Sequence, residues 1–503
     1  MWGSDNLTTR EDRAPSVAKR ESVLPMTAPI FPIDVVIMAA GKGTRMKSRL
    51  PKVLQRLAGM PLVQHVLNTA AQLNARSAVV ITGHGADQVE PLLLAPGQAL
   101  AVQCVRQEPQ LGTGHAVQQA VPALADDGVV VVLSGDVPLT QADTLQALIA
   151  QCGADKLALL TIDFADPTGY GRIVRGGGQG DAVQAIVEHK DASEAQRAIR
   201  EVYSGIMAVP ARLLKAWLAR LDNQNAQGEY YLTDVVKFAV ADGVPVVAHK
   251  IADALQVAGI NSPVQLAELE RAHQLRQAHR YMEQGVRLKD PARFDLRGQL
   301  DCAQDVEIDV NCIFEGQVSL GEGVKVGANC VLANCTIAAG AVIHPFTHID
   351  GEKAGVQVGA GALVGPFARL RPGAVLEEKA RVGNFVEVKN AVLHAGAKAN
   401  HLTYLGDADV GAGANIGAGT ITCNYDGYFK YRTVIGERAF IGSNSALIAP
   451  VKIGADAIVA AGSAVSRDVA DGELRLVRAE QLVKPGWADR FHDAMKRKKA
   501  ERK

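Results

Sequence analysis

Cysteine is scarce in this chain and follows no recognisable pattern. Seven cysteines are spread over 503 residues, their number is odd, and no two of them stand in a C-x-x-C spacing. Neither a structural zinc site nor a disulfide framework is therefore expected. Free thiols fit a reducing compartment, so we expect the protein to be cytoplasmic.

Long apolar runs and an excess of one charge are also missing. No hydrophobic stretch approaches the about 20 residues that a membrane-spanning helix needs. The N-terminus carries both charge signs and lacks the apolar core of a signal peptide. Lysine plus arginine and aspartate plus glutamate each number 53, so the net charge is zero. We therefore expect neither a membrane partner nor a nucleic-acid partner.

The chain is too long for one hydrophobic core, so two or three domains are expected. Residues 1–32 are rich in charged residues and serine and are predicted to be a disordered extension, within which Met26 is an alternative start. Residues 481–503 form a basic C-terminal tail. We interpret its last residues, Met495–Lys503, as a solvated, disordered end.

Strands and helices alternate between Ile33 and about residue 262. This β-α-β pattern predicts an α/β, Rossmann-like domain with a mostly parallel sheet and helices on both faces. Ligands bind such sheets at the carboxyl ends of the strands. The expected strands are 35–39, 78–82 and 129–133, and the expected helices are 61–73 and 114–121.

A glycine-containing loop follows the first strand, in Met38-Ala-Ala-Gly-Lys-Gly-Thr-Arg-Met46. Gly41 and Gly43 allow positive φ and a close approach of a ligand, and backbone N–H groups in such a loop bind phosphate. Arg45 and Lys52 add two cations for a triphosphate. The pattern is neither G-x-G-x-x-G nor the Walker P-loop, so its spacing alone does not identify a nucleotide site.

Three further segments are expected at the same edge of the sheet. Gln107–Gly114 opens a helix and suits the reading of a base by main-chain and amide groups. Asp136 ends the 129–133 strand, where a carboxylate either binds Mg²⁺ or simply caps the next segment. Glu188 is interpreted as an acceptor for sugar hydroxyls, because nucleotidyl transfer needs positioning and charge neutralisation more than proton transfer.

The second half of the chain has a different sequence pattern. Residues 263–297 predict an exposed helical linker. From about Ile308 a six-residue period predicts an all-β parallel β-helix over 298–480, with roughly ten coils stacked about 4.8 Å apart. Cys330 is expected to fill an inner corner of a coil. The inward aliphatic positions are Val358, Val364, Leu370, Leu376, Val382 and Val388, then Ile435, Ile441, Leu447, Ile453, Val459 and Val465.

The repeat is interrupted twice, and chemistry is expected at the interruptions. Asn400–Gly406 contains His401, whose pKa range suits a general base, and Thr420–Lys430 loops out of the coil. Arg371, Lys389 and Lys430 could hold a sugar phosphate. Since a solenoid has no pocket of its own, sites must lie in grooves between solenoids, which argues for an oligomer.

The motifs A-A-G-K-G-T-R-M and L-P-K-V-L resemble the signature of sugar-nucleotide pyrophosphorylases. With L-G-T-G-H-A, G-D-V-P-L, D-P-T-G-Y-G-R-I, I-V-E-H-K-D and Q-G-E-Y-Y-L-T-D, they resemble the bifunctional N-acetylglucosamine-1-phosphate uridylyltransferase/glucosamine-1-phosphate acetyltransferase family from residue 33 to about 480. The resemblance implies a uridylyltransferase domain over 33–262, a left-handed β-helix acetyltransferase domain over 298–480, and a homotrimer.

The implied enzyme makes UDP-N-acetylglucosamine in two steps. It acetylates glucosamine-1-phosphate from acetyl-CoA, then joins the product to UTP with Mg²⁺ and releases pyrophosphate. The product feeds peptidoglycan and lipopolysaccharide synthesis. Both substrates and co-substrates are small molecules.

The resemblance also assigns residues to each step. It implies that Asp136 and Asn261 bind Mg²⁺, and that His401 is the base. We expect Arg45 and Lys52 to stabilise charge in uridylyl transfer. Ser134 and Tyr203 depart from the family pattern, which often has Tyr and Asn at these places. The UTP and UDP-N-acetylglucosamine contacts are Met38, Ala39, Ala40, Gly41, Arg45, Lys52, Gln107, Gly112, Thr113, Ser134, Gly135, Asp136, Gly171, Glu188, Tyr203 and Asn261. The glucosamine-phosphate contacts are Arg371, Lys389, Tyr404, Asn415 and Lys430, and the acetyl-CoA contacts are Ala418, Asn424, Tyr425, Ser443, Ala461 and Arg478.

Two other classes of function compete with this interpretation. One is a nucleotidyltransferase whose β-helix only oligomerises or regulates it, which the interruptions at His401 and Asn424 argue against. The other is a non-enzymatic binding protein with two scaffold halves. The loop Gly41–Arg45, together with Lys52 and Asp136, argues against a scaffold.

Overall fold

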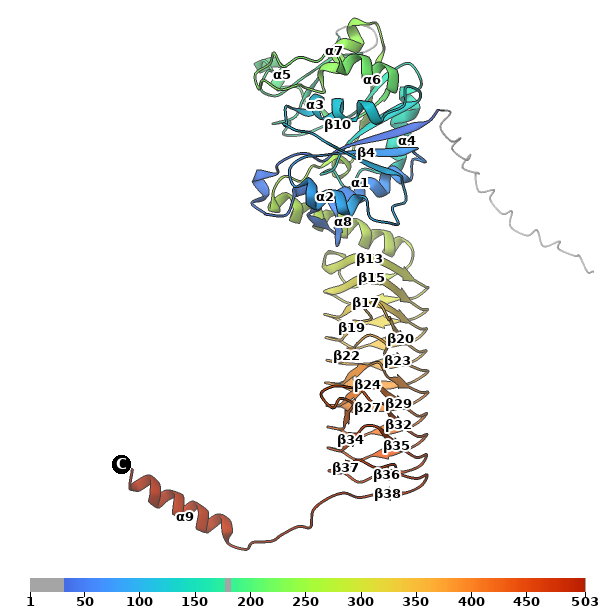
Figure 1. The fold of residues 1–503 in the computed structure, drawn as a ribbon, viewed down its shortest axis with the longest axis vertical. Coiled ribbons are helices and arrows are strands. Elements are labelled where there is room, and N and C mark those ends of the chain that lie inside the picture. Colours follow the sequence, from blue (N-terminus) through green and yellow to red (C-terminus); the bar gives the residue numbers. More distant parts are fainter. Residues whose placement is uncertain (1–30, 177–181, 503) are drawn as a thin grey trace, which may run out of the picture.

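The computed structural model describes residues 31–176 and 182–502. Residues 1–30, for which the sequence predicts disorder as part of residues 1–32, lie outside the described residues. The remainder forms an α/β domain stacked on a long left-handed parallel β-helix (Figure 1). Both parts of the predicted fold class are confirmed.

The N-terminal domain is built on a nine-stranded sheet with the main order β11-β7-β10-β6-β1-β4-β5. Strands β1, β4, β5 and β6 are mutually parallel, and β10 runs antiparallel to β6 and β7. The strands are β1 (Ile33–Met38), β4 (Ser77–Thr82), β5 (Val102–Arg106), β6 (Val129–Ser134), β7 (Leu157–Asp163), β8 (Arg172–Arg175), β9 (Val183–Val187), β10 (Glu201–Pro210) and β11 (Val246–Ile251). A short hairpin, β2 (Arg56–Leu57) with β3 (Met60–Pro61), lies apart from this sheet.

Helices cover both faces of this sheet, because alternate residues of each central strand face opposite cores. Val35 and Ile37 of β1 belong to one apolar core, and Val36 belongs to the other. The continuous apolar runs in the sequence are therefore strands buried on both sides. The helices are α1 (Leu62–Ala71), α2 (Ala86–Leu93), α3 (Thr113–Ala120), α4 (Ala142–Cys152), α5 (Glu194–Arg197), α6 (Ala211–Leu218) and α7 (Asp234–Ala241). All three expected strands and both expected helices are present within one or two residues of their predicted ends.

The β-helix stacks its coils as parallel ladders, each strand pairing with the equivalent strand one coil away (Figure 1). All twelve predicted inward positions are at most 2% exposed, so the six-residue register is confirmed. One ladder contains β12 (Arg287–Leu288), β14 (Glu307–Ile308), β16 (Lys325–Val326), β18 (Val342–Ile343), β21 (Leu363–Val364), β24 (Arg381–Asn384), β27 (Lys398–His401), β30 (Asn415–Ile416), β33 (Phe440–Ile441), β36 (Ile458–Val459) and β38 (Leu474–Arg475).

The remaining β-helix strands form one larger sheet that wraps the other two sides. They are β13 (Phe294–Cys302), β15 (Cys312–Leu320), β17 (Val331–Ile337), β19 (His348–Asp350), β20 (Val356–Val358), β22 (Arg369–Leu370), β23 (Val375–Leu376), β25 (Glu387–Lys389), β26 (Val392–Leu393), β28 (Tyr404–Gly406), β29 (Ala408–Val410), β31 (Ile421–Cys423), β32 (Thr433–Ile435), β34 (Ala446–Ile448), β35 (Val451–Ile453) and β37 (Ala464–Val465).

Cys330 lies in an inner corner of the β-helix, as expected. Its side chain is fully buried, and Sγ donates a weak hydrogen bond to the His344 carbonyl at 3.3 Å. Burial raises the pKa of this thiol to about 11. A thiol with so little thiolate is a structural group.

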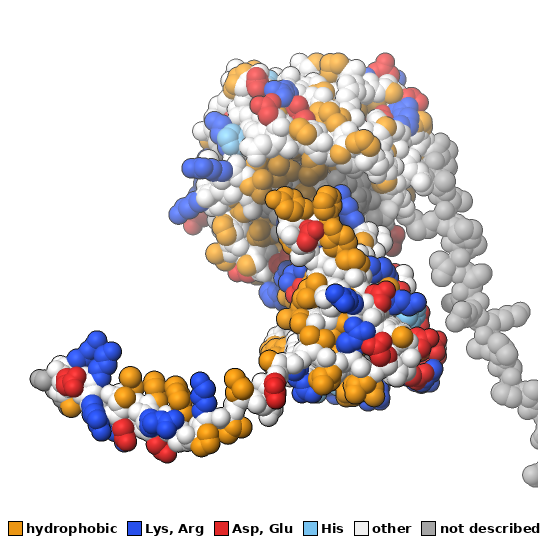
Figure 2. Space-filling view, turned by 60° about the horizontal axis from the view of Figure 1, so that its bottom comes forward, with side chains coloured by type: hydrophobic (Ala, Val, Ile, Leu, Met, Phe, Trp, Pro, Cys, Tyr) orange, Lys and Arg blue, Asp and Glu red, His pale blue; other side chains and the backbone are white. Residues whose placement is uncertain are grey.

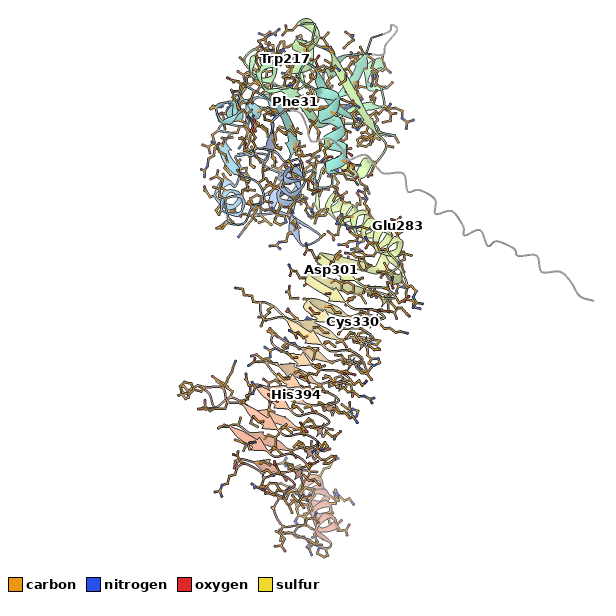
Figure 3. All side chains as sticks on the ribbon, turned by 90° about the vertical axis from the view of Figure 1, so that its right-hand side faces the viewer. Phe31, Trp217, Glu283, Asp301, Cys330 and His394 are labelled. Carbon is orange, nitrogen blue, oxygen red and sulfur yellow. The ribbon has the colours of Figure 1, made fainter. Side chains whose placement is uncertain are left out.

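Helix α8 (Pro263–Glu283) joins the two halves, and it is less exposed than the sequence predicted. Leu269 packs with the N-terminal domain, whereas Ala278 and Tyr281 pack on the first coils of the β-helix. The Tyr281 hydroxyl donates to the Leu300 carbonyl at 2.7 Å. Figure 3 shows α8 between Glu283 and the α/β domain, and β-helix strands already begin at β12, before residue 298.

The prediction of a disordered basic end is wrong for residues 495–500, which are helical. Helix α9 (Trp487–Ala500) forms there, because Ala, Met, Lys and Arg favour helix and Trp487 stacks on Phe491 one turn later. All of its residues are exposed, and it stands away from the β-helix (Figure 2). Within the described part of the chain, no helix is both long enough and apolar enough to cross a membrane.

Candidate active sites

A cavity of about 460 Å³ opens where β1 and β6 end. This is the sheet edge at which the sequence placed a nucleotide. Ten predicted residues line the cavity: Met38, Ala39, Ala40, Gly41, Lys52, Gln107, Gly112, Thr113, Ser134 and Asp136. The structure therefore brings together predicted residues from four separate segments of the chain.

Two oxygen acceptors converge on the Lys52 ammonium at this cavity. The Lys52 ammonium donates to a carboxylate oxygen of Asp136 and to the Asn261 side-chain carbonyl, the latter at 3.1 Å. The Ile260 backbone N–H donates to the Asp136 carbonyl at 3.0 Å, which holds the Asn261 segment against the end of β6. The side chains of Lys52 and Asp136 are only 14% and 18% exposed. An anion and an amide carbonyl are thus preorganised around a positive charge.

Lys52 can take this position because Gly43, which packs against it, has no side chain. Gly43 has a φ of +57°, and a Cβ there would lie 2.8 Å from the Lys52 Cβ. Gly41, in contrast, has open space where a side chain would stand. Arg45 lies in a short 3₁₀ turn, Thr44–Met46, where it is exposed and does not line the cavity.

A second glycine lets two distant loops meet at the rim of the cavity. Gly112 has a φ of +111°, and a Cβ there would lie 2.6 Å from the Tyr230 carbonyl. The Tyr230 backbone N–H donates to the Leu111 carbonyl at 2.8 Å. The Leu232 N–H donates to Thr113 Oγ1 at 3.1 Å. The segment around Tyr230 therefore fixes the loop that carries Gly112 and Thr113.

The predicted sugar contacts form a separate group beyond the cavity lining. Glu188 accepts a hydrogen bond from Thr233 Oγ1 at 3.0 Å, and burial raises the pKa of its carboxyl. The Tyr203 N–H donates to the Gly171 carbonyl at 2.9 Å. The Tyr203 hydroxyl is buried without a partner among the described residues, and burial raises its pKa. The Gly135 backbone N–H donates to the Met38 carbonyl at 2.9 Å.

Sequence reasoning missed several residues of this site. Glu229 and Thr233 lie in the motif Q-G-E-Y-Y-L-T-D, whose pattern alone does not indicate which of its side chains face the cavity. Lys42 lies inside the glycine loop itself. The other missed lining residues are Val53, which follows Lys52, and Gln110 and Ala116, which lie in the loop and helix that carry Gly112 and Thr113.

The second candidate site is on the β-helix around His401. Strands β24 and β27 pair in parallel, and Asn384 stands opposite His401 in their register. His401 Nδ1 lies 2.7 Å from Asn384 Oδ1. A carbonyl oxygen only accepts, so Nδ1 is the donor in this contact, and in the neutral imidazole the lone pair is then on Nε2. His401 is exposed and is arranged to accept a proton at Nε2.

The three cations predicted to hold a sugar phosphate, Arg371, Lys389 and Lys430, act on one another across the β-helix. Lys430 lies beside Lys389 and lowers the pKa of the Lys389 ammonium, and burial and Arg371 act in the same direction. Arg371 donates to Glu387 at 2.7 Å, which raises the pKa of its guanidinium. Like charges this close indicate a site for an anion.

The loop from Thr420 to Lys430 leaves the β-helix and exposes aromatic side chains. Tyr425 forms an isolated antiparallel bridge with Lys430. Tyr425, Tyr428 and Phe429 are 60%, 87% and 67% exposed. In Figure 3 this loop projects sideways from the stack at about the level of His394. Asn415 lies in β30, directly beside the strand of His401.

The predicted acetyl-CoA contacts fall in successive coils. The Asn444 N–H donates to the Ala418 carbonyl, and the Gly462 N–H to the Ser443 carbonyl, both at 2.8 Å. Ala461 precedes Gly462, whose Cβ position lies 3.6 Å from the Arg478 side chain. These positions thus run along one corner of the β-helix, next to the coil of His401.

Comparison with known proteins covers both halves. A family model described as MobA-like NTP transferase domain matches residues 35–226, and one described as bacterial transferase hexapeptide (six repeats) matches 432–467. A solved structure of apo UDP-glucose pyrophosphorylase is 16% identical, covers 49% of this chain and 99% of its own, and gives a TM-score of 0.40.

Curated relatives match nearly from end to end. The bifunctional protein GlmU of Albidiferax ferrireducens is 70% identical over 462 residues, which is 90% of this chain and 99% of the relative. That of Paracidovorax citrulli is 68% identical, covering 90% and 98%. That of Polaromonas naphthalenivorans is 69% identical, covering 91% and 98%.

Proposed function

The chain belongs to the family of bifunctional GlmU proteins, and from this membership we propose how its two halves divide the work. It is a UDP-N-acetylglucosamine diphosphorylase and a glucosamine-1-phosphate N-acetyltransferase, acting on nucleotide and acetyl-CoA substrates. Its product serves cell-wall synthesis. We place uridylyl transfer in the cavity of the α/β domain and acetyl transfer at His401.

In uridylyl transfer the phosphate of N-acetylglucosamine-1-phosphate attacks the α-phosphorus of UTP in line, and pyrophosphate leaves. We assign nucleotide binding to the cavity residues, from Gly41 to Thr113. Lys52 and Arg45 would stabilise charge developing on the transferring phosphate. Glu188 would accept from a sugar hydroxyl, since Thr233 already holds one side of its carboxylate.

The donor set beside the cavity fits Mg²⁺. Oxygen atoms of Asp136 and Asn261 both contact the Lys52 ammonium, so these two side chains already accommodate a cation. No group of three or more His, Cys, Asp or Glu side chains converges among the described residues. Mg²⁺ suits such a sparse site, because it keeps water and phosphate ligands. When bound, Mg²⁺ neutralises triphosphate charge.

In acetyl transfer the amine of glucosamine-1-phosphate attacks the thioester carbonyl, and CoA leaves as the thiolate. His401 Nε2 would take the proton that the amine loses, while Asn384 holds the proton on Nδ1. Arg371, Lys389 and Lys430 would bind the sugar phosphate. The corner from Ala418 to Arg478 would bind acetyl-CoA.

We further propose a homotrimer that completes the acetyl site. His401 is exposed, and the corner above it carries a stripe of apolar side chains. Phe346, Phe367 and Phe385 stack on one another and are 51%, 48% and 56% exposed, and Leu402 continues the stripe at 60%. A second copy covering this stripe would form a groove at His401. Light scattering on the purified chain measures the mass directly.

We infer that the enzyme works in the cytoplasm. All seven cysteines are free thiols. Burial raises the pKa of the Cys152 thiol to about 12, and it raises the pKa of Cys335 likewise. Such thiols persist in a reducing compartment.

The observation that carries the function is the 70% identity over 99% of a bifunctional relative. The test follows pyrophosphate and free CoA thiol in parallel, with UTP, Mg²⁺, glucosamine-1-phosphate and acetyl-CoA each omitted in turn. We expect CoA release without UTP, and pyrophosphate that depends on acetyl-CoA. Pyrophosphate from supplied N-acetylglucosamine-1-phosphate, with no CoA release under any condition, would leave a nucleotidyltransferase with a structural β-helix.

His401→Ala separates the two activities. We expect acetyl transfer to fall by about 10²–10⁴-fold, the usual contribution of a general base, while uridylyl transfer stays unchanged. Loss of both activities in a folded protein would contradict the division into two sites.

A further inference from the structure

We propose that Asp407 is a positioning residue for acetyl transfer, which holds the Asn424 amide so that its carbonyl oxygen faces the amine of the sugar. The inference rests on the proposed acetyltransferase site. Asp407 lies at the end of β28, one residue after the strand, and is not among the residues that the family resemblance assigned.

The hydrogen bonds of Asp407 fix which way the amide points. Asp407 Oδ2 accepts from Asn424 Nδ2 at 2.5 Å, and Oδ1 accepts from Asn390 Nδ2 at 2.5 Å. An ionised carboxylate has no proton to donate, so each amide must turn its NH₂ group toward it. The Asn424 carbonyl oxygen is consequently directed away from Asp407.

That carbonyl oxygen is open to a ligand. Asn424 is 7% exposed as a residue, and none of the described residues donates to its Oδ1. Asn424 Oδ1 has no protein donor among the described residues, yet it is not fully buried. Part of the small exposed area of Asn424 therefore belongs to this oxygen. An attacking amine carries N–H donors, and a fixed carbonyl that accepts one of them orients the nitrogen lone pair.

Asn424 and a predicted sugar contact meet over one glycine. A Cβ on Gly406 would lie 2.2 Å from the Tyr404 hydroxyl and 2.8 Å from Asn424 Nδ2. Both polar groups therefore stand together beside Asp407, and only a glycine leaves them room. This places the Asn424 amide within the same cluster as the sugar-binding side chains.

Asp407 also lies beside the phosphate-binding cations. The charged groups that act on Lys389 are Lys430 and Arg371, which lower its pKa, and Asp407, which raises it. Asp407 thus helps to keep Lys389 protonated in a crowded cationic site. The Asp407 carboxylate thus holds Asn424, which we place beside the sugar amine, and favours the charged form of Lys389, which we place beside the sugar phosphate.

The fold holds Asp407 rigidly. Its φ is +48°, a left-handed conformation that aspartate tolerates better than most residues. Its N–H donates to the Lys389 carbonyl, and its own carbonyl accepts from the Thr433 N–H, both at 3.1 Å. The carboxylate therefore has a fixed base in the corner of the coil.

The experiment compares Asp407→Asn with the wild type, using the full chain and both assays. Asparagine at 407 fits the same space and the same φ but offers no second acceptor, so the Asn424 amide is no longer fixed. We expect kcat for acetyl transfer to fall by about 10–100-fold, the cost of a misplaced reacting group. Uridylyl transfer should stay unchanged.

The pH profile supplies a readout that a purely structural role would not move. Without the Asp407 charge, the Lys389 ammonium loses its proton at lower pH. The alkaline rise in KM for glucosamine-1-phosphate should then begin at lower pH than in the wild type. Asp409→Asn is the matched control, because Asp409 binds His394 and Arg432 instead. Its pH profile should equal that of the wild type.

A double variant tests whether Asp407 acts through Asn424. If it does, Asp407→Asn adds little further loss of kcat to Asn424→Ala. Independent multiplication of the two losses, an unchanged kcat in Asp407→Asn, or a parallel loss of uridylyl transfer would each overturn the proposal. A wild-type chain that releases no CoA would instead overturn the proposed acetyltransferase function.

Discussion

The imidazole of His401 and the amide of Asn384 face each other across paired strands, with 2.7 Å between Nδ1 and Oδ1. The parallel register of the β-helix creates this contact, because equivalent positions of successive coils lie side by side. The proposed base, His401, and the amide that orients it, Asn384, are 17 residues apart in the sequence. The repeat brings them together because they occupy equivalent positions in successive coils.

Removing the orienting amide should weaken acetyl transfer without abolishing it. In Asn384→Ala, nothing holds the proton on Nδ1 of His401, so the two tautomers interconvert. We expect kcat to fall on the order of 10-fold, a part of what a general base contributes. A thiol-release assay measures it. Asn311→Ala, which removes an asparagine contact to Asn329 in an early coil, should leave kcat unchanged.

Asp136→Ala should impair uridylyl transfer and spare acetyl transfer. The variant leaves Asn261 as the one proposed ligand, so the Mg²⁺ concentration needed for half-maximal pyrophosphate release should rise about 10-fold or more. Titration of Mg²⁺ at fixed UTP checks this. An unchanged Mg²⁺ dependence would remove Asp136 from the metal site.

Gly112→Ala should damage UTP binding through the backbone. Gly112 has a φ of +111° and a ψ of 175°, a backbone conformation that costs alanine about 1–3 kcal/mol, and the new Cβ would meet the Tyr230 carbonyl. We expect KM for UTP to rise, while acetyl transfer is kept. Gly97→Ala is the control, since Gly97 has a φ of +96° but open space around it. Equal effects of the two variants would show that strain alone is responsible.

Acid should destabilise the junction between the α/β domain and helix α8. His65 and His273 face each other there with ring centroids 6.3 Å apart, and burial lowers the pKa of both, that of His273 to about 4. The unfolded chain takes up these protons below about pH 6.5, and the folded chain does not. Stability is therefore full above pH 6.5 and falls between pH 6.5 and about 4.

The loss associated with His273 should reach roughly 3 kcal/mol. Urea unfolding of the wild type and of His273→Gln, at pH 8 and at pH 4.5, measures it. The variant should lose less stability on acidification than the wild type. His492→Gln on the exposed helix α9 should behave as the wild type does.

The sequence predicted what depends on local pattern. The buried run at β1 and the six-residue spacing from Val358 to Val465 reflect periodicities that only one architecture satisfies. The motif resemblance added most of the cavity lining. Ten assigned residues do line it, although their roles stay predictions.

What escaped prediction depends on contacts far apart in the chain. Lys52 meets Asn261 across 209 residues, and Gly112 meets Tyr230 across more than a hundred. No local pattern encodes either contact. Helix α9 escapes prediction for another reason: its lysines and arginines indicate a solvated end, whereas Trp487 and Phe491 give the same segment an apolar side.

The stacked ladder of the β-helix has a consequence for the reaction intermediate. Six rungs separate β12, next to the α/β domain, from β27, which carries His401. At about 4.8 Å each, these rungs span roughly 29 Å of rigid structure. With the sites placed as we propose, N-acetylglucosamine-1-phosphate leaves the acetyl site at His401 and reaches the cavity of the α/β domain by diffusion through bulk water. Unlabelled intermediate added to the mixture would then dilute the isotope carried from labelled acetyl-CoA into the final sugar nucleotide.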